Sequence, residues 1–311
     1  MGISVDLDPV SHYVHCRGWE LGPHTNPNAV CEEALPRFLD ILDQLQIKAT
    51  FFVVGTDLEV ARSRAALARA AAAGHELANH TYHHRLDFYR LPGAHREEEI
   101  ATAEILLRDL TGRPVRGFRS PGWNLDPGVL DILERRGYSY DATVVPGPWS
   151  HGLRVVQALW DPMPDLENFA GQSWLPWSPD SPYRPGQGPS CKGEERHIVE
   201  IPGAVTPGLR LPWYGTARLA LGRSYFRLAT ATIAREDKVA SYVFHGLELV
   251  DYARDIRDPR LLVKPGLQFS MEEKTRIVRE TLVTLQDRFD LCPLEQIASD
   301  FVARNPVGEA S

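Results

Sequence analysis

Five short stretches of this chain carry carboxylate, imidazole or guanidinium side chains of the kind that hydrolases use. Asp6 and Asp8 stand in "SVDLDP", and His80 and His84 stand in "NHTYHH". The stretches "RSPGW", "YDAT" and "VFH" follow farther along the chain. Two histidines and one carboxylate form a common ligand set for a catalytic zinc ion, with positions left for water and substrate. We therefore expect a catalytic metal site rather than a closed structural one, although a histidine pair alone is a weak signal and is more often structural.

The spacing within two of these stretches favours a shared site. In an extended strand, residues i and i+2 face the same side, so Asp6 and Asp8 are expected to point together into one pocket. His80 and His84 are four residues apart, and on a helical turn both imidazoles would face one cation. His83 would then lie off that face. Asp8, His80 and His84 are thus the predicted metal ligands.

The pattern of apolar residues predicts an α/β fold. Strand-like runs alternate with segments of helical period, which favours parallel strands in an α/β barrel or a doubly wound sheet. The expected strands are Ile3–Asp8, Ala49–Val54, Glu76–Asn79, Val115–Arg119, Ser139–Thr143, Ile198–Ile201 and Ala240–Phe244. The expected helices are Asn28–Gln44, Glu59–Ala73, Ala94–Leu110, Pro127–Arg136, Met271–Phe289 and Pro293–Val302.

This order of elements would bring the reactive side chains to one edge. Active sites of α/β barrels gather at the carboxyl ends of the parallel strands. His12 and His15 follow the first strand and could also reach that edge. Polar residues stand at or near the expected strand ends throughout: Asp6, Asp8, His80, Arg119, Asp141 and His245.

We expect one catalytic domain over residues 1–311, with a helical tail at about 270–303. The alternation of elements breaks at about 149–196, in a stretch rich in Pro, Gly, Ser and Trp. We interpret this stretch as a long substrate-facing insertion, with a disordered excursion as the alternative. Several aromatic residues could form a sugar-stacking wall, Trp177 above all, or could be packing residues: Trp174, Trp177, Tyr183 and Trp213.

Composition narrows the class of protein. The chain has 311 residues, 43% of them hydrophobic, and a net charge of -7, which argues against a nucleic-acid partner. The first strand-like run begins at once, so we expect no secretory signal, and no apolar run is long enough to span a bilayer. The four cysteines show no CxxC spacing and are expected to be reduced. These features predict a cytoplasmic protein.

A basic amphipathic helix is expected within residues 208–235, where Arg218, Arg223 and Arg227 recur among leucines and aromatics. It could lie on a membrane surface and admit a lipid-linked sugar. A barrel helix whose arginines extend their charged ends into water is the favoured alternative.

The ordered motifs resemble those of the polysaccharide deacetylase superfamily, the NodB-type carbohydrate esterases. The aspartate pair matches the family's first motif, "HTYHH" matches its H-[ST]-x-x-H metal motif, and "VFH" matches its late L-x-H motif. The arginine–proline–tryptophan motif matches Arg119, Pro121 and Trp123. The resemblance covers roughly the first 145 residues and the last strand. It implies a distorted (β/α)7-type barrel with a long Pro/Trp-rich insertion.

The resemblance also implies a mechanism. Asp8, His80 and His84 would hold a divalent ion, most simply Zn²⁺, with Co²⁺, Ni²⁺ or Mn²⁺ as alternatives. The ion would polarise an amide carbonyl, and Asp6 would act as general base toward water. Arg119 would pair with Asp6, unless it forms only a surface salt bridge.

The remaining motifs would complete the site. His245 would protonate the leaving amine, and Asp141 could orient His245. Trp123 would wall the pocket beside Pro121, and a backbone N–H near Trp123 could help to hold the oxyanion. The expected reaction is removal of an N-acyl group, most simply N-acetyl, from an amino sugar. The substrate could be a glycan precursor, a lipid-linked sugar or a secondary-metabolite sugar.

One departure from the family pattern widens the choice of substrate. The usual signature has adjacent aspartates followed by Gly-Pro, whereas Leu7 separates Asp6 from Asp8 here. This spacing resembles the branch of intracellular-type peptidoglycan deacetylases, aminoarabinose-lipid deformylases and cofactor-free allantoinases. A deformylase or a ureide amidohydrolase is therefore an alternative, and a silent glycan-binding module is another. The predicted metal ligands, general base and general acid are all present in the sequence, which argues against a non-catalytic binding module.

Overall fold

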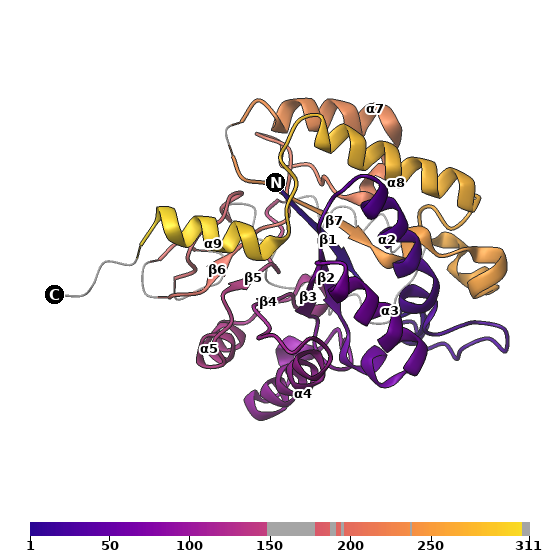
Figure 1. Cartoon of the computed structure of the whole chain (residues 1–311), viewed down its shortest axis with the longest axis horizontal. Coiled ribbons are helices and arrows are strands. Elements are labelled where there is room, and N and C mark those ends of the chain that lie inside the picture. Colours follow the sequence, from indigo (N-terminus) through magenta and orange to yellow (C-terminus); the bar gives the residue numbers. More distant parts are fainter. Residues whose placement is uncertain (148–177, 187–190, 194–195, 237, 307–311) are drawn as a thin grey trace.

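Seven parallel strands form one curled sheet in the computed structural model of this chain (Figure 1). The structure describes residues 1–147, 178–186, 191–193, 196–236 and 238–306. The strand order is β6-β5-β4-β3-β2-β1-β7, a half-barrel of the distorted barrel type that was expected. The strands are β1 (Gly2–Asp6), β2 (Thr50–Val53), β3 (Glu76–Asn79), β4 (Gly117–Phe118), β5 (Tyr140–Asp141), β6 (Val199–Glu200) and β7 (Ser241–His245).

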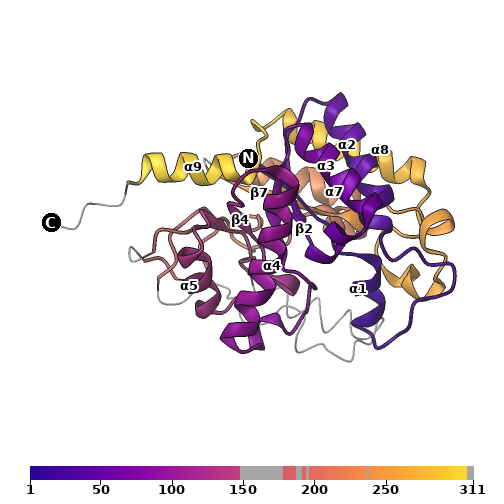
Figure 2. The same ribbon diagram turned by 60° about the horizontal axis from the view of Figure 1, so that its bottom comes forward.

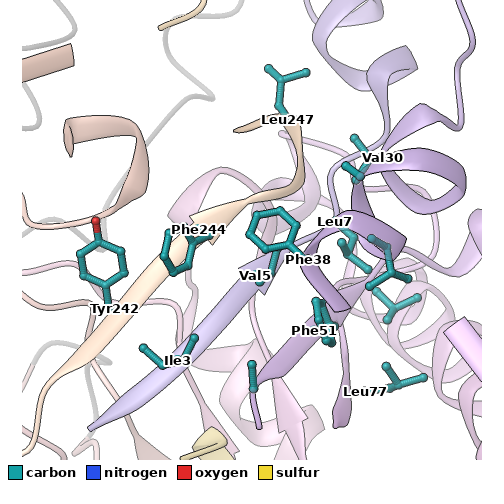
Figure 3. Packing of buried hydrophobic residues seen from close by; sticks show 14 of the residues in the cluster. Ile3, Val5, Leu7, Val30, Phe38, Phe51, Leu77, Tyr242, Phe244 and Leu247 are labelled. Carbon is teal, nitrogen blue, oxygen red and sulfur yellow. The ribbon is translucent and has the colours of Figure 1, made fainter. Parts of the chain in front are cut away.

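Strand β1 shows how the sequence divides the two faces of the sheet. Ile3 and Val5 are buried and join Phe38 and Phe244 in the main hydrophobic cluster (Figure 3). Ser4 and Asp6 lie on the opposite face of β1, because successive residues of a strand face opposite sides. Ile3 and Val5 therefore pack in the main hydrophobic cluster, while Asp6 is presented on the other face.

Helices cover the outer face of the sheet, and α7 and α8 lie side by side (Figures 1 and 2). The expected helices are confirmed with small shifts at their ends, and a π-helical turn at Val30–Ala34 leads into α2. The short helix α1 after the first strand was not predicted. The α-helices are α1 (Val10–His15), α2 (Leu35–Gln44), α3 (Ala61–Ala72), α4 (Gly93–Thr111), α5 (Pro127–Arg135), α7 (Gly215–Ile233), α8 (Met271–Gln286) and α9 (Leu294–Arg304).

Helix α9 lies against the amino ends of the strands, opposite the predicted site. The backbone N–H of Leu294 donates to Oγ1 of Thr50 at 2.8 Å, and that of Glu295 donates to the Glu76 carboxylate at 3.0 Å. The Tyr140 hydroxyl donates to the same carboxylate at 2.8 Å. These bonds give the first N–H groups of α9 the acceptors that a helix start needs.

The predicted aromatic wall is only partly described. Trp174, Trp177 and most of the 149–196 insertion lie outside the described residues. Tyr183 is buried and pairs with β6 through Glu200. Trp213 is buried against Tyr242, with ring centroids 5.0 Å apart. Tyr183 and Trp213 are therefore packing residues, the alternative that the sequence left open.

The expected basic helix exists as α7, but its arginines do not share one face. Arg218 is buried, with its guanidinium 3.9 Å from the Glu280 carboxylate and 5.8 Å from the centre of the Phe226 ring. Arg223 is exposed, and Gly222 breaks the helical backbone with a φ of 83°. Among the described residues, the helices are too short or too polar to cross a membrane.

Candidate metal and catalytic centre

The three predicted metal ligands converge. Oδ1 of Asp8 lies 3.2 Å from Nε2 of His80 and 3.3 Å from Nε2 of His84. The two Nε2 atoms are 3.1 Å apart, and all three residues are buried. Two imidazole nitrogens and a carboxylate oxygen facing one point suit a small divalent cation such as Zn²⁺.

Contacts on the outer side of His80 agree with that use. Its Nδ1 lies 2.7 Å from the backbone carbonyl of Arg119, which only accepts, so Nδ1 carries the proton. The lone pair of Nε2 is then left for the shared point. Burial opposes the charge of Asp8, but His84 and His80 outweigh it and hold the pKa of Asp8 well below its usual range.

The histidine loop is not helical, which corrects the expected helical turn. Thr81 and His84 have left-handed backbones, with φ of 63° and 56°. Oδ1 of Asn79 accepts the Thr81 N–H at 2.8 Å, and Oγ1 of Thr81 accepts the His84 N–H at 3.1 Å. A tight turn fixed by side-chain acceptors therefore brings the two imidazoles together.

Glu99 of α4 holds the same loop from outside. Its carboxylate accepts the backbone N–H groups of Tyr82 and His83, at 3.1 and 2.9 Å, and lies 2.6 Å from Nδ1 of His83. His83 thus points away from the ligand set, as predicted. The sequence did not predict these roles of Asn79 and Glu99, because both residues act by accepting backbone N–H groups of the loop, which motif spacing does not reveal.

Asp6 and Arg119 form a fully buried ion pair, not the surface salt bridge that was the alternative. Nη1 of Arg119 also meets Oγ of Ser4 at 3.1 Å, and its Nε donates to the Ala142 carbonyl at 2.8 Å. The guanidinium is held near the Phe52 ring, 4.0 Å from its centroid. These contacts fix the direction in which the Asp6 carboxylate points.

His245 ends β7 directly opposite Asp6 in the strand register. Its Nε2 lies 4.0 Å from Oδ2 of Asp6, and its Nδ1 lies 3.8 Å from Oε1 of Glu248. Burial favours neutral imidazole, but Glu248, Asp6 and Asp8 outweigh burial and raise the pKa of His245 to about 9. The imidazole is therefore suited to be an acid at neutral pH.

Asp141 does not take the place beside His245 that the sequence suggested. Oδ1 of Asp141 accepts the Thr143 hydroxyl at 2.6 Å, and Glu200 lies opposite it in the β5–β6 register. Within the described part of the chain, Glu248 is instead the carboxylate on the Nδ1 side of His245, as Asp6 is on the Nε2 side. Burial, together with the negative charge of Asp141, raises the pKa of Glu200 well above its usual range.

Aromatic and imidazole side chains surround the ligand set. Trp123 lies beside His245, with ring centroids 6.3 Å apart, and it follows buried Pro121 in a tight turn. The N–H of Trp123 itself donates to the Ser120 carbonyl at 3.3 Å. On the other side, His12 packs edge-on against His84, with ring centroids 4.2 Å apart.

Helix α1 supplies a further contact that the sequence did not reveal. The Tyr13 hydroxyl donates to Oδ2 of Asp8 at 3.0 Å. The other carboxylate oxygen of Asp8 is the one that faces the histidines. Tyr13 therefore orients the Asp8 carboxylate, as an outer hydrogen bond does for a metal ligand. Because α1 itself was not predicted, nothing pointed to Tyr13.

Comparison with known proteins agrees with this geometry. Residues 17–140 match the sequence family described as "Polysaccharide deacetylase". The Helicobacter pylori "Peptidoglycan deacetylase" is 25% identical over 202 residues, 64% of this chain and 62% of that protein. The Bradyrhizobium "Chitooligosaccharide deacetylase" is 38% identical over 96 residues, 30% of this chain and 41% of that protein. The chain thus spans less than two thirds of these curated relatives.

Solved structures share the fold over nearly the whole chain. A Mycobacterium smegmatis protein assigned as a polysaccharide deacetylase has a TM-score of 0.62 at 19% identity, covering 100% of this chain and 93% of that one. The "Puue Allantoinase" has a TM-score of 0.61 at 16% identity, covering 98% and 90%. Residues 17–140 thus match a polysaccharide deacetylase family, and the likeness to these solved structures shows a shared fold.

Proposed function

We propose that this protein hydrolyses the N-acetyl group of an amino-sugar substrate with the help of a divalent metal ion. The observation that carries the proposal is the meeting of three groups at one sheet edge. These are the Asp8–His80–His84 ligand set, the buried Asp6–Arg119 pair and His245, which lies opposite Asp6 at the end of β7. The matched relatives named as peptidoglycan and chitooligosaccharide deacetylases supply the class of bond and substrate.

Each residue has a defined task in this scheme. Bound by the ligand set, a divalent ion supplies Lewis acidity at the amide carbonyl and makes water there more acidic. Asp6 takes a proton from the attacking water, and Arg119 keeps its carboxylate oriented toward that water. His245 then donates a proton from Nε2 to the leaving amine. Trp123 flanks this position as one wall of the substrate site.

A substrate panel tests the proposal. Purified protein is incubated with N-acetylated chitooligosaccharides, peptidoglycan fragments and lipid-linked or nucleotide-linked N-acetyl sugars, and released acetate is measured. We expect acetate release that a chelator abolishes and Zn²⁺ or Co²⁺ restores. N-formyl sugars and allantoin are included, because release of formate or ureide hydrolysis without acetate would replace the proposal by the deformylase or allantoinase alternative. Binding of glycans without any hydrolysis would favour the silent module.

A further inference from the structure

The Glu248 side chain is more buried and makes more contacts than a carboxylate that only caps a helix at the protein surface. It lies three residues after His245, in the 3₁₀ turn Gly246–Leu249, and its side chain is only 4% exposed. Its Oε1 accepts the backbone N–H of His245 at 3.3 Å and the hydroxyl of Thr216 at 3.0 Å. Thr216 belongs to the first turn of α7, so this carboxylate joins two separate elements.

The start of α7 is shaped to admit this carboxylate. Gly215 is the first residue of α7, and a Cβ placed on it would lie 2.2 Å from Oε2 and 2.5 Å from Oε1 of Glu248. Any larger residue would displace the carboxylate. The N-terminal end of a helix also favours a nearby negative charge. The chain therefore leaves room for the Glu248 carboxylate beside the start of α7 and the start of its own 3₁₀ turn.

The Thr216 hydroxyl links this carboxylate to the His245 ring. Oγ1 of Thr216 lies 3.4 Å from Nδ1 of His245 and donates its own proton to Glu248. Because a hydroxyl oxygen has two lone pairs, the Thr216 oxygen can also accept the Nδ1–H of a protonated imidazole. The direct distance between Glu248 and Nδ1 is 3.8 Å, too long for a hydrogen bond but close enough for strong charge attraction.

We propose that Glu248, acting through the Thr216 hydroxyl, is the positioning residue that keeps the proton of His245 on Nδ1 and turns Nε2 toward the scissile amide. This assignment rests on the proposed deacetylase function. When the C–N bond breaks, its electron pair goes to the nitrogen, which takes the Nε2 proton. The imidazole becomes neutral and retains its Nδ1–H on Thr216. Among the described residues, the charged groups that face His245 are Glu248, Asp6 and Asp8.

Paired substrates separate this role from a purely structural one. An amide needs its leaving amine protonated, whereas the phenolate of 4-nitrophenyl acetate leaves without a proton. We expect Glu248→Gln and Thr216→Val to lower kcat on the N-acetyl sugar by roughly 10–100-fold, a fraction of what a general acid contributes. KM for the sugar and the rate of ester hydrolysis should change by less than about twofold, because general-acid catalysis acts on the departure of the amine and the phenolate needs no proton. Thr216→Ser, which keeps the hydroxyl, should restore amide turnover, and exposed Glu98→Gln should match wild type.

Two results would overturn the assignment. One is an equal loss of turnover on the amide and the ester in the Glu248 and Thr216 variants, which would mean a structural role. The other is full turnover of the amide by Glu248→Gln. If wild type releases no acetate at all, the proposed function fails, and NMR of the imidazole nitrogens still tests Glu248 alone. The nitrogen signals of His245 are identified as those that are missing from the spectrum of His245→Gln. The protonation midpoint of His245 should then fall by about one pH unit or more in Glu248→Gln, and an unchanged midpoint would refute the link.

Discussion

The Nε2 atoms of His80 and His84 lie 3.1 Å apart although no helix joins the two residues. The loop between them reaches this geometry through left-handed backbones at Thr81 and His84. Conformations of this kind cost energy in non-glycine residues and persist only where the surroundings fix them. Here the fixing groups are the Asn79 amide oxygen and the Glu99 carboxylate.

Metal content should depend on His80 and not on its neighbour His83. His80→Ala removes one of three ligands and is expected to lose the divalent ion, measured by elemental analysis of purified protein at about one ion per chain in wild type. His83→Ala is the matched control, because its side chain turns to Glu99 and its backbone N–H bond survives. Equal metal loss in both variants would contradict the ligand assignment.

Glu99→Ala should weaken both the fold and the metal site. The change leaves two backbone N–H groups of the loop without their acceptor, which costs about 1–3 kcal/mol of unfolding free energy. Metal affinity should fall roughly 10–100-fold, the usual effect of losing an outer support. Urea unfolding and calorimetric titration with Zn²⁺ measure the two quantities.

The control for Glu99 is its neighbour on α4. Glu98→Ala alters an exposed side chain and should leave stability within about 0.5 kcal/mol and metal affinity at the wild-type value. A Glu99 variant that behaves like the Glu98 variant would show that the loop holds its shape without this carboxylate.

Much of the fold was predictable, because the signals are local. The alternation on β1 assigns Ile3 and Val5 to the core and Asp6 to the polar face, and the structure agrees. The ends of parallel strands then necessarily meet at one edge. Asp8 and His80 both follow such strand ends, so their approach at this edge could be expected.

The unpredicted features depend on contacts between distant parts of the chain. Asp141 and Glu248 are both carboxylates near motif residues, and sequence gives no reason to prefer one as the partner of His245. The preference comes from the register of β5 with β6, which places Asp141 against Glu200, and from the approach of Thr216 on α7. Such choices are set by tertiary packing, not by residue spacing.

Asp6→Asn should separate catalysis from metal binding. The amide side chain of this variant would no longer take a proton from water, so kcat should fall by roughly 10²–10⁴-fold while the metal content stays at the wild-type value. Arg119 would lose its counter-charge in a buried site, which should lower the unfolding free energy by about 3–5 kcal/mol. Acetate release, elemental analysis and thermal unfolding check the three effects, and undiminished turnover would remove the general-base role.

Glu76 should make stability depend on pH at the end of the sheet opposite the site. Burial, aided by Glu295, outweighs the hydrogen bonds from Thr50 and Tyr140 and raises the pKa of Glu76 from 4.5 to about 7. The folded state therefore keeps a proton that the unfolded state releases. Its stabilising effect is full below pH 4.5 and is lost as pH rises through about 7, a total of about 3 kcal/mol.

Glu76→Gln should remove this part of the pH dependence. Urea unfolding at pH 5 and pH 8 should show a smaller loss of stability for the variant than for wild type. Exposed Glu98→Gln provides the control and should follow wild type. Parallel curves for wild type and the Glu76 variant would mean that this carboxyl is already ionised in the folded protein at pH 5.

Gly215→Ala should impair catalysis through Glu248, since the three atoms nearest to an added Cβ all belong to that side chain. The added methyl group would meet both carboxylate oxygens and push them away from Thr216.

Gly93→Ala is a closely matched control, because Gly93 is likewise the first residue of a helix, α4, and a Cβ there meets nothing within 4 Å. Alanine favours helix over glycine, so Gly93→Ala should keep full turnover and wild-type or slightly higher stability. Amide turnover of Gly215→Ala should fall to the level of Glu248→Gln while the ester is still hydrolysed. Wild-type amide turnover in Gly215→Ala would mean that His245 does not depend on where this carboxylate lies.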